Sequence, residues 1–104
     1  MIDKKPILAD RVRKIAAGFS WIDRRIVRDG HLAVLDSPAI LLYYFLTTVA
    51  DVQGLSFWAD PTVAKLLKVP LGHVVGARDQ LVKHDLVAFR YPLYQVLSLP
   101  EVRP

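Results

Sequence analysis

Apolar residues recur at helical spacing in three long stretches of the chain, and the strongest covers residues 37–50. Ser37 as N-cap, Pro38 at the first helical position and Gly54 beyond the end are typical boundaries of a helix. The interior is apolar on nearly every side, with Leu42, Phe45, Leu46 and Val49 as expected core residues. A helix without a polar face has to be covered all round, by its own domain or by a second copy.

Two further helices are expected between residues 60 and 84, with Val69-Pro70 as the break between them. Asp60 and Pro61 suit the start of the first helix. Asp85 suits the turn after the second, because Asp tolerates the left-handed region of backbone space. The expected core positions are Val63, Leu66 and Leu67 in the first helix and Val74, Ala77 and Leu81 in the second, which runs from about Leu71 to His84.

The remaining elements are short. Ser20 and Asp23 have the spacing of a helix start, and Gly30 suits the end of a helix of about two turns. Residues 55–59 form a short apolar run typical of a strand, and residues 86–99 alternate in two β-type runs around Tyr91-Pro92. The order is therefore helix, helix, strand, helix, turn, helix, hairpin.

A helix-turn-helix followed by a two-stranded hairpin is the winged-helix arrangement. We therefore expect a mainly α fold with a small β-hairpin, in the order α-α-β-α-α-β-β. Residues 1–18 would form a basic N-terminal arm, residues 19–99 the winged-helix domain and residues 100–104 a C-terminal tail.

Several features of residues 19–99 occur together in one known group of proteins. They are the aromatic-Ile pair Trp21-Ile22, the arginine-rich segment after it, the Leu-Tyr-rich helix, Asp60-Pro61 before the helix-turn-helix, and Leu86-Val87 after it. In these features the chain resembles the winged-helix domains of plasmid replication initiators and DnaD-type primosomal proteins, and small helix-turn-helix proteins of mobile elements. The resemblance implies that exposed positions of the 71–84 helix contact bases.

Composition narrows the classes of protein. The chain has 104 residues, 53% of them hydrophobic, which suits one globular domain. It has no cysteine, which excludes disulfides, thiolate metal sites and cysteine nucleophiles. The longest uncharged run, residues 37–50, is shorter than the ~18–20 residues of a membrane span, and the charged N-terminus lacks an apolar signal core. We expect a cytoplasmic protein.

Positive charge is concentrated at the start of the chain. Residues 1–28 hold eight basic side chains and three acidic ones, whereas the remainder has a net charge of −1. Such an arm often binds phosphates, because each neutralised phosphate releases counterions; the alternative is a solubilising tail. The candidate DNA-binding residues are Lys4, Lys5, Arg11, Arg13, Lys14, Arg24, Arg25, Arg28, Lys65, Lys68, His73, Arg78 and Lys83.

The 71–84 helix is poorly equipped to read bases. Arg, Asn and Gln normally do so, because they present paired hydrogen-bonding groups to base edges. The corresponding positions here are Leu71, Gly72, His73, Val75 and Gly76, of which only His73 can form hydrogen bonds. The hairpin has only Arg90 beside its Tyr91-Pro92 turn. We therefore expect any DNA binding to depend mainly on phosphate contacts.

Catalysis finds no support in the residue pattern. His31, His73 and His84 lack the spacing of metal ligands, and the five glycines are scattered rather than gathered in a phosphate-binding loop. We expect no enzyme activity, no metal and no cofactor.

Two functions remain open. The first is a DNA-associated winged-helix protein of the replication-initiation or mobile-element type, which binds as a homodimer. The second is a winged-helix module that docks another protein without reading DNA sequence. The candidate interface residues are Tyr43, Tyr44, Leu71, Val75 and Val82.

Overall fold

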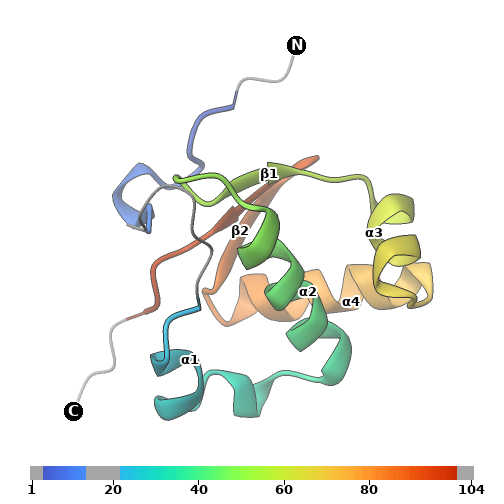
Figure 1. The fold of residues 1–104 in the computed structure, drawn as a ribbon, viewed down its shortest axis with the longest axis horizontal. Helices are drawn as coiled ribbons and strands as arrows, with labels where there is room; N and C mark the ends of the chain where they lie inside the picture. Colours follow the sequence, from blue (N-terminus) through green and yellow to red (C-terminus); the bar gives the residue numbers. More distant parts are fainter. Residues whose placement is uncertain (1–3, 14–21, 101–104) are drawn as a thin grey trace.

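The computed structural model describes residues 4–13 and 22–100. Their elements follow the expected order and confirm a mainly α fold with a small sheet (Figure 1). The helices are α1 (Arg25–Arg28), α2 (Ser37–Val49), α3 (Asp60–Leu67) and α4 (Leu71–Lys83). The strands are β1 (Leu55–Phe57), β2 (Val87–Arg90) and β3 (Leu93–Val96), and two 3-10 turns are η1 (Ala9–Arg11) and η2 (Leu32–Val34). This arrangement fits a winged helix-turn-helix.

The three strands form one antiparallel sheet in the order β1-β3-β2. Strands β2 and β3 are the hairpin, with Arg90 opposite Leu93 and Tyr91-Pro92 as the turn. Successive side chains of a strand point to opposite faces. Tyr94 and Val96 therefore face the helices, where they belong to the main core, and Leu93 and Gln95 lie on the outer face of the sheet.

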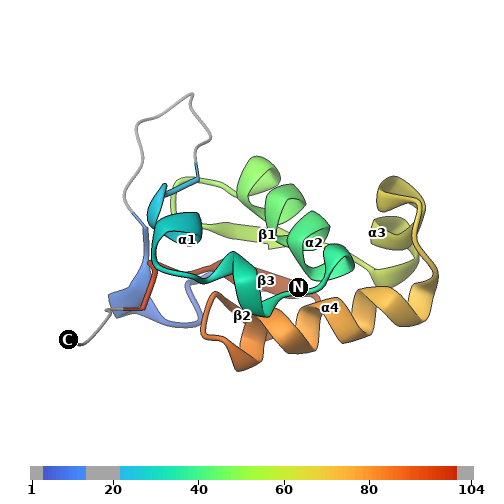
Figure 2. The same cartoon turned by 90° about the horizontal axis from the view of Figure 1, so that it is seen from below.

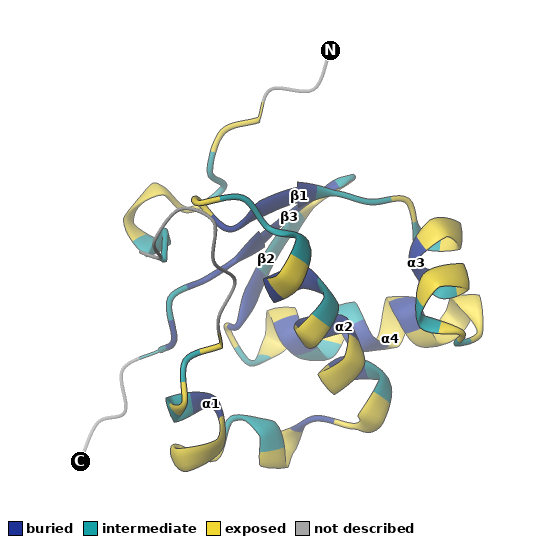
Figure 3. Ribbon diagram, in the orientation of Figure 1, coloured by how far each residue is buried: buried dark blue, intermediate teal, exposed yellow. Residues whose placement is uncertain are grey.

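The core lies between the sheet and the pair α2 and α4 (Figure 3). Val74, Ala77 and Leu81 line the buried side of α4, as predicted. Leu42 and Leu46 of α2 are also fully buried, while Phe45 is half-buried and packs edge-on against Trp58. Helix α3 inserts Val63, together with the half-buried Ala64 and Leu67.

Two predicted details of α2 and α3 are wrong. Asp36, not Ser37, is the N-cap of α2, since its carboxylate accepts a hydrogen bond from the Ala39 amide at 3.0 Å. The Asp36 carboxylate also accepts a 2.6 Å bond from Gln80 of α4, and these two hydrogen bonds lower its pKa. Leu66 is 55% exposed rather than in the core.

Local backbone conformation explains where several elements end. Asp85 is left-handed at φ 62°, as predicted, and Gly30 follows α1 at φ 81°. Lys68 ends α3 at φ 57°, a left-handed position that the sequence pattern does not predict. Helix α1 is a single turn, shorter than predicted; Ser20, the expected start, lies outside the described residues.

The described part of the arm, residues 4–13, packs across the outer face of the sheet. The Leu8 amide donates to Gln95 Oε1 at 2.7 Å, and Gln95 Nε2 donates to the Leu8 carbonyl at 2.9 Å. Val12 forms a β-bridge with Leu97. Beneath the arm, Leu55, Leu93, Gln95 and Leu97 are all at most 5% exposed. The arm is thus part of the folded domain rather than a free extension.

Among the described residues, no helix combines the length and the apolar character that a membrane crossing needs.

Candidate nucleic-acid interface

Helices α3 and α4 are the two helices of the helix-turn-helix, and α4 is the one that such proteins normally place in the major groove. The first helix normally crosses the DNA backbone. Lys65 of α3 and Lys68 at its C-cap are exposed, and neither forms an ion pair with a residue that the structure describes. These two lysines are therefore exposed charges at the C-terminal end of this helix.

The exposed side of α4 carries little hydrogen-bonding capacity. Gly72, Gly76, Asp79 and Lys83 fall on one line along it, at spacings of three and four residues. Apart from the backbone of the helix itself, no heavy atom lies within 4 Å of where a Cβ would stand at either glycine, so close packing within the domain does not require them. His73 is exposed beside this line. Leu71, Val75 and Val82, the candidate interface residues of α4, are 50%, 39% and 45% exposed.

Arg78, a predicted phosphate contact, is held inside the domain. Its Nη1 donates to Asp60 Oδ1 at 2.7 Å and to the Tyr94 hydroxyl at 3.1 Å, and its guanidinium lies 4.2 Å from the centre of the Phe89 ring. Burial lowers the pKa of Arg78, but the hydrogen bonds to Asp60 and Tyr94 outweigh burial and raise it. Arg78 joins α3, α4 and the hairpin.

The cations of the arm are also engaged within the domain. Lys4 Nζ lies 2.8 Å from Asp51 Oδ2. Arg11 Nη1 donates to Asp85 Oδ2 at 2.9 Å, and its other nitrogens donate to the hydroxyl and carbonyl oxygens of Ser98. Arg13 donates to the Thr47 carbonyl at 3.1 Å. Burial lowers the pKa of the Arg13 guanidinium.

The other candidates of the N-terminal quarter are spread out. Lys5 is exposed, and Lys14 lies outside the described residues. Arg24 and Arg28 are exposed at α1, and Arg28 Nε lies 3.5 Å from Asp29 Oδ1. Arg25 forms a 2.6 Å ion pair with Asp23. Helices α1 and α3 lie at opposite ends of the molecule (Figures 1 and 2). The arginines of α1 and the lysines of α3 therefore do not form one surface.

The pKa of the Asp23 carboxyl should be about 2 instead of its usual 3.8, because Arg25 donates hydrogen bonds to it. A depressed pKa in the folded state contributes stability that is present above pH 3.8 and is lost as pH falls through about 2. Carboxyl carbon shifts in an NMR titration measure this midpoint. In Arg25→Gln the midpoint should return toward 3.8, and a wild-type midpoint already at 3.8 would contradict the ion pair.

The two tyrosines of α2 have different environments. Tyr43 is 5% exposed and belongs to the core, and burial raises the pKa of its phenol. It therefore has almost no surface to lose in an interface, contrary to what was expected for both tyrosines. Tyr44 is 62% exposed and shares a face of α2 with Ile40 and Leu41.

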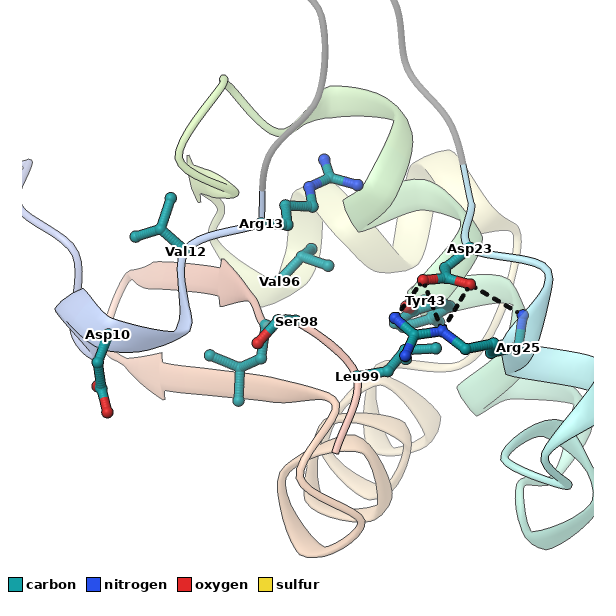
Figure 4. A pocket seen from close by; sticks show the side chains of 10 residues that line it. Asp10, Val12, Arg13, Asp23, Arg25, Tyr43, Val96, Ser98 and Leu99 are labelled. Atoms are coloured by element: carbon teal, nitrogen blue, oxygen red, sulfur yellow. Dashed lines mark hydrogen bonds and ion pairs between the residues drawn. The ribbon is translucent and has the colours of Figure 1, made fainter. Parts of the chain in front are cut away.

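A pocket of about 420 Å³ lies between the arm, α1 and the segment after β3. Arg13 and the Asp23–Arg25 pair lie on opposite sides of it, with Val96 and Leu99 between them (Figure 4). Tyr43 also lines it. Arg25 is paired with the Asp23 carboxylate, and Arg13 donates to the Thr47 carbonyl, so both guanidinium groups are already held by oxygens of the protein.

The hairpin turn holds a residue that the sequence analysis did not single out as a site. Tyr91 is 72% exposed, the largest exposed fraction among the large apolar side chains of the described residues. Its ring lies edge-on to Phe89, with 6.4 Å between ring centres. Arg90 beside it is exposed and forms no ion pair with a described residue. The signal available in the sequence was an aromatic side chain at the apex of a two-residue hairpin.

Comparison of the chain with family models, with curated proteins and with solved structures finds no match. Within residues 4–13 and 22–100, no group of three or more His, Cys, Asp or Glu side chains could hold a metal ion. The fold and the distribution of exposed charge therefore provide the basis for a functional proposal.

Proposed function

We propose that this protein binds DNA mainly through phosphate contacts made by the helix-turn-helix and the hairpin. The observation that carries the proposal is a set of four exposed cations without an ion-pair partner among the described residues. They are Lys65 of α3, Lys68 at the C-cap of α3, Lys83 of α4 and Arg90 of β2. These elements are the ones that a winged helix turns toward DNA.

Such binding discriminates little between sequences. Phosphate contacts fix the position of a protein on DNA and carry no direct sequence information. On α4, Leu71 and Val75 can touch a thymine methyl group, and His73 can supply a single hydrogen bond. The bidentate contacts that separate one base pair from another are not available from these side chains.

The finer part of the proposal rests on the resemblance of residues 19–99 to replication initiators and mobile-element proteins. We propose that the DNA belongs to a replication-initiation or mobile-element system, and that the protein binds it as a homodimer. The face of α2 formed by Ile40, Leu41 and Tyr44 supports a second copy, because these side chains are 37%, 43% and 62% exposed.

The test replaces two lysines on α3. Lys65→Gln with Lys68→Gln should reduce duplex affinity and lower the slope of log affinity against log salt by about 1.8, since each lost phosphate contact lowers it by about 0.9. Fluorescence anisotropy with a labelled duplex at several salt concentrations measures the slope. Changing both lysines leaves the buried residues of α3 untouched.

The matched control is Arg24→Gln with Arg28→Gln, which removes the same charge at the opposite end of the molecule. It should change the slope by less than half as much. Equal losses in the two variants would mean that the protein responds only to net charge, and an unchanged slope in the lysine variant would remove α3 from the interface.

One observation favours a second candidate, a protein-docking module. Leu71, Val75 and Val82 form an exposed apolar stripe on α4, and Arg78, which interrupts it in sequence, turns inward to Asp60. Such a stripe suits a partner helix or a second copy. Failure of the wild-type protein to bind any duplex at low salt would favour this candidate over DNA binding.

A further inference from the structure

The apex of the hairpin presents an aromatic ring that the domain does not need for its own packing. Tyr91 is 72% exposed, whereas Tyr94, two residues into the next strand, is fully buried. Large aromatic side chains normally bury most of their surface, so a ring left in solvent at an apex suggests a partner for its face.

The ring is nevertheless held in place. Phe89 lies edge-on to Tyr91, and the Phe89 ring is itself fixed between Tyr94, at 4.6 Å between ring centres, and the Arg78 guanidinium. The turn is anchored as well, since the Trp58 amide donates to the Pro92 carbonyl at 3.1 Å. A pre-oriented ring loses little conformational entropy when a ligand stacks on it.

The charge around the ring suits a nucleic acid. Arg90 precedes Tyr91, is exposed and has no ion-pair partner among the described residues. Arg90 is paired with Leu93 across the hairpin, so it stands directly beside the turn that carries Tyr91. An exposed aromatic ring beside a cation is the combination by which proteins hold single strands, with the base on the ring and the phosphate on the cation.

We propose that Tyr91 is a stacking platform for an unpaired base of single-stranded DNA, with Arg90 on the adjacent phosphate. This inference rests on the proposed function and specifies the form of DNA that the hairpin takes. A base inside a duplex has both faces covered by its neighbours, so the ring can stack only on an unpaired base or a strand end. The hairpin thus provides a single-strand contact next to a helix-turn-helix that meets duplex.

The experiment measures affinity for a short oligothymidylate and for a duplex of the same length. Tyr91→Ala should weaken single-strand binding by roughly 5- to 150-fold, the range of one lost base–aromatic stack, and leave duplex binding within about twofold. Tyr91→Phe keeps the ring and should bind like wild type. Val27→Ala is the control, because it removes an exposed apolar side chain (65%) from α1, outside the helix-turn-helix, the hairpin and the proposed dimer face.

A second readout separates stacking from charge. An oligonucleotide of abasic residues keeps every phosphate but has no base to stack. Wild type should lose affinity for it, whereas Tyr91→Ala should bind the abasic and thymidine strands almost equally.

Four outcomes would overturn the proposal. They are equal single-strand affinity of Tyr91→Ala and wild type, a loss in Tyr91→Phe as large as in Tyr91→Ala, an equal loss in Val27→Ala, and a change in solution mass in Tyr91→Ala that identifies a contact between copies. The first three leave duplex binding and the proposed function intact. Failure of the wild-type protein to bind either form at low salt would instead remove the proposed function itself.

Discussion

Truncation of residues 1–13 is expected to lower the free energy of unfolding by at least ~3 kcal/mol. The described part of this segment pairs with Gln95 and Leu97 on the outer face of the sheet, where Leu55, Leu93 and Leu97 are each at most 5% exposed. A fully buried leucine contributes about 1.5–3 kcal/mol. The truncation also removes both hydrogen-bond partners of the buried Gln95 amide. Urea unfolding followed by circular dichroism measures the change, and exposed leucines on an open sheet face should also promote aggregation.

The control separates packing from charge. Lys4→Gln with Lys5→Gln removes two arm charges but leaves Leu8 on Gln95, so stability should stay within about 1 kcal/mol of wild type. A truncated protein as stable as wild type, with reduced DNA affinity, would show that the arm is a separate phosphate-binding extension. Because truncation disturbs the fold, the lysine variant is the cleaner test of whether the arm contributes charge to DNA binding.

Hydrophobic periodicity predicted which face of a long helix turns toward the core. Val74, Ala77 and Leu81 recur at helical spacing, and all three are buried in α4. Short-range backbone preferences were equally informative, since Asp85 adopts the left-handed conformation expected of it. Leu66 was misplaced because the periodicity of a helix of eight residues does not settle which leucine faces the core.

Long-range contacts explain what the sequence could not predict. Leu8 and Gln95 are 87 residues apart in the sequence. No local pattern around either residue indicates that the Leu8 backbone will pair with the Gln95 side-chain amide. Charge composition suggested a free basic arm, but Asp51 and Asp85, far along the chain, pair with Lys4 and Arg11. A count of charges gives the partners that are possible, whereas the fold determines which carboxylates come close.

The positions of the candidate interface residues also depend on long-range packing that the sequence pattern does not reveal. The arginines at α1 and the lysines on α3 form one list in the sequence but lie at opposite ends of the domain. Tyr43 and Tyr44 are adjacent in sequence, yet one enters the core and the other faces solvent, because neighbouring positions of a helix differ by about 100°. The exposed ring of Tyr91 follows from the two-residue turn, whose apex residues lack neighbours on the outer side.

Arg78→Met is expected to destabilise the protein by about 2–3 kcal/mol, because it removes the charge that compensates Asp60 and the hydrogen bond to Tyr94. Breaking a fully buried ion pair costs about 3–5 kcal/mol, and the lower value applies here since the Arg78 and Asp60 side chains are 12% and 23% exposed. Methionine keeps an unbranched apolar stem, so the loss reflects the guanidinium. Denaturant unfolding measures it.

Arg90→Met is the matched control, and it should change stability by no more than about 0.5 kcal/mol because Arg90 is exposed. Comparison of Arg78→Met with Arg90→Met also decides whether Arg78 supports the fold or binds phosphate. A structural arginine loses stability on substitution, and the weaker support for Phe89 should loosen the Tyr91 ring, whereas a phosphate-binding arginine would lose duplex affinity at unchanged stability. An Arg78→Met protein that is as stable as Arg90→Met but binds duplex DNA more weakly than wild type would favour Arg78 as a phosphate contact. That result would contradict its role as the link between α3, α4 and the hairpin.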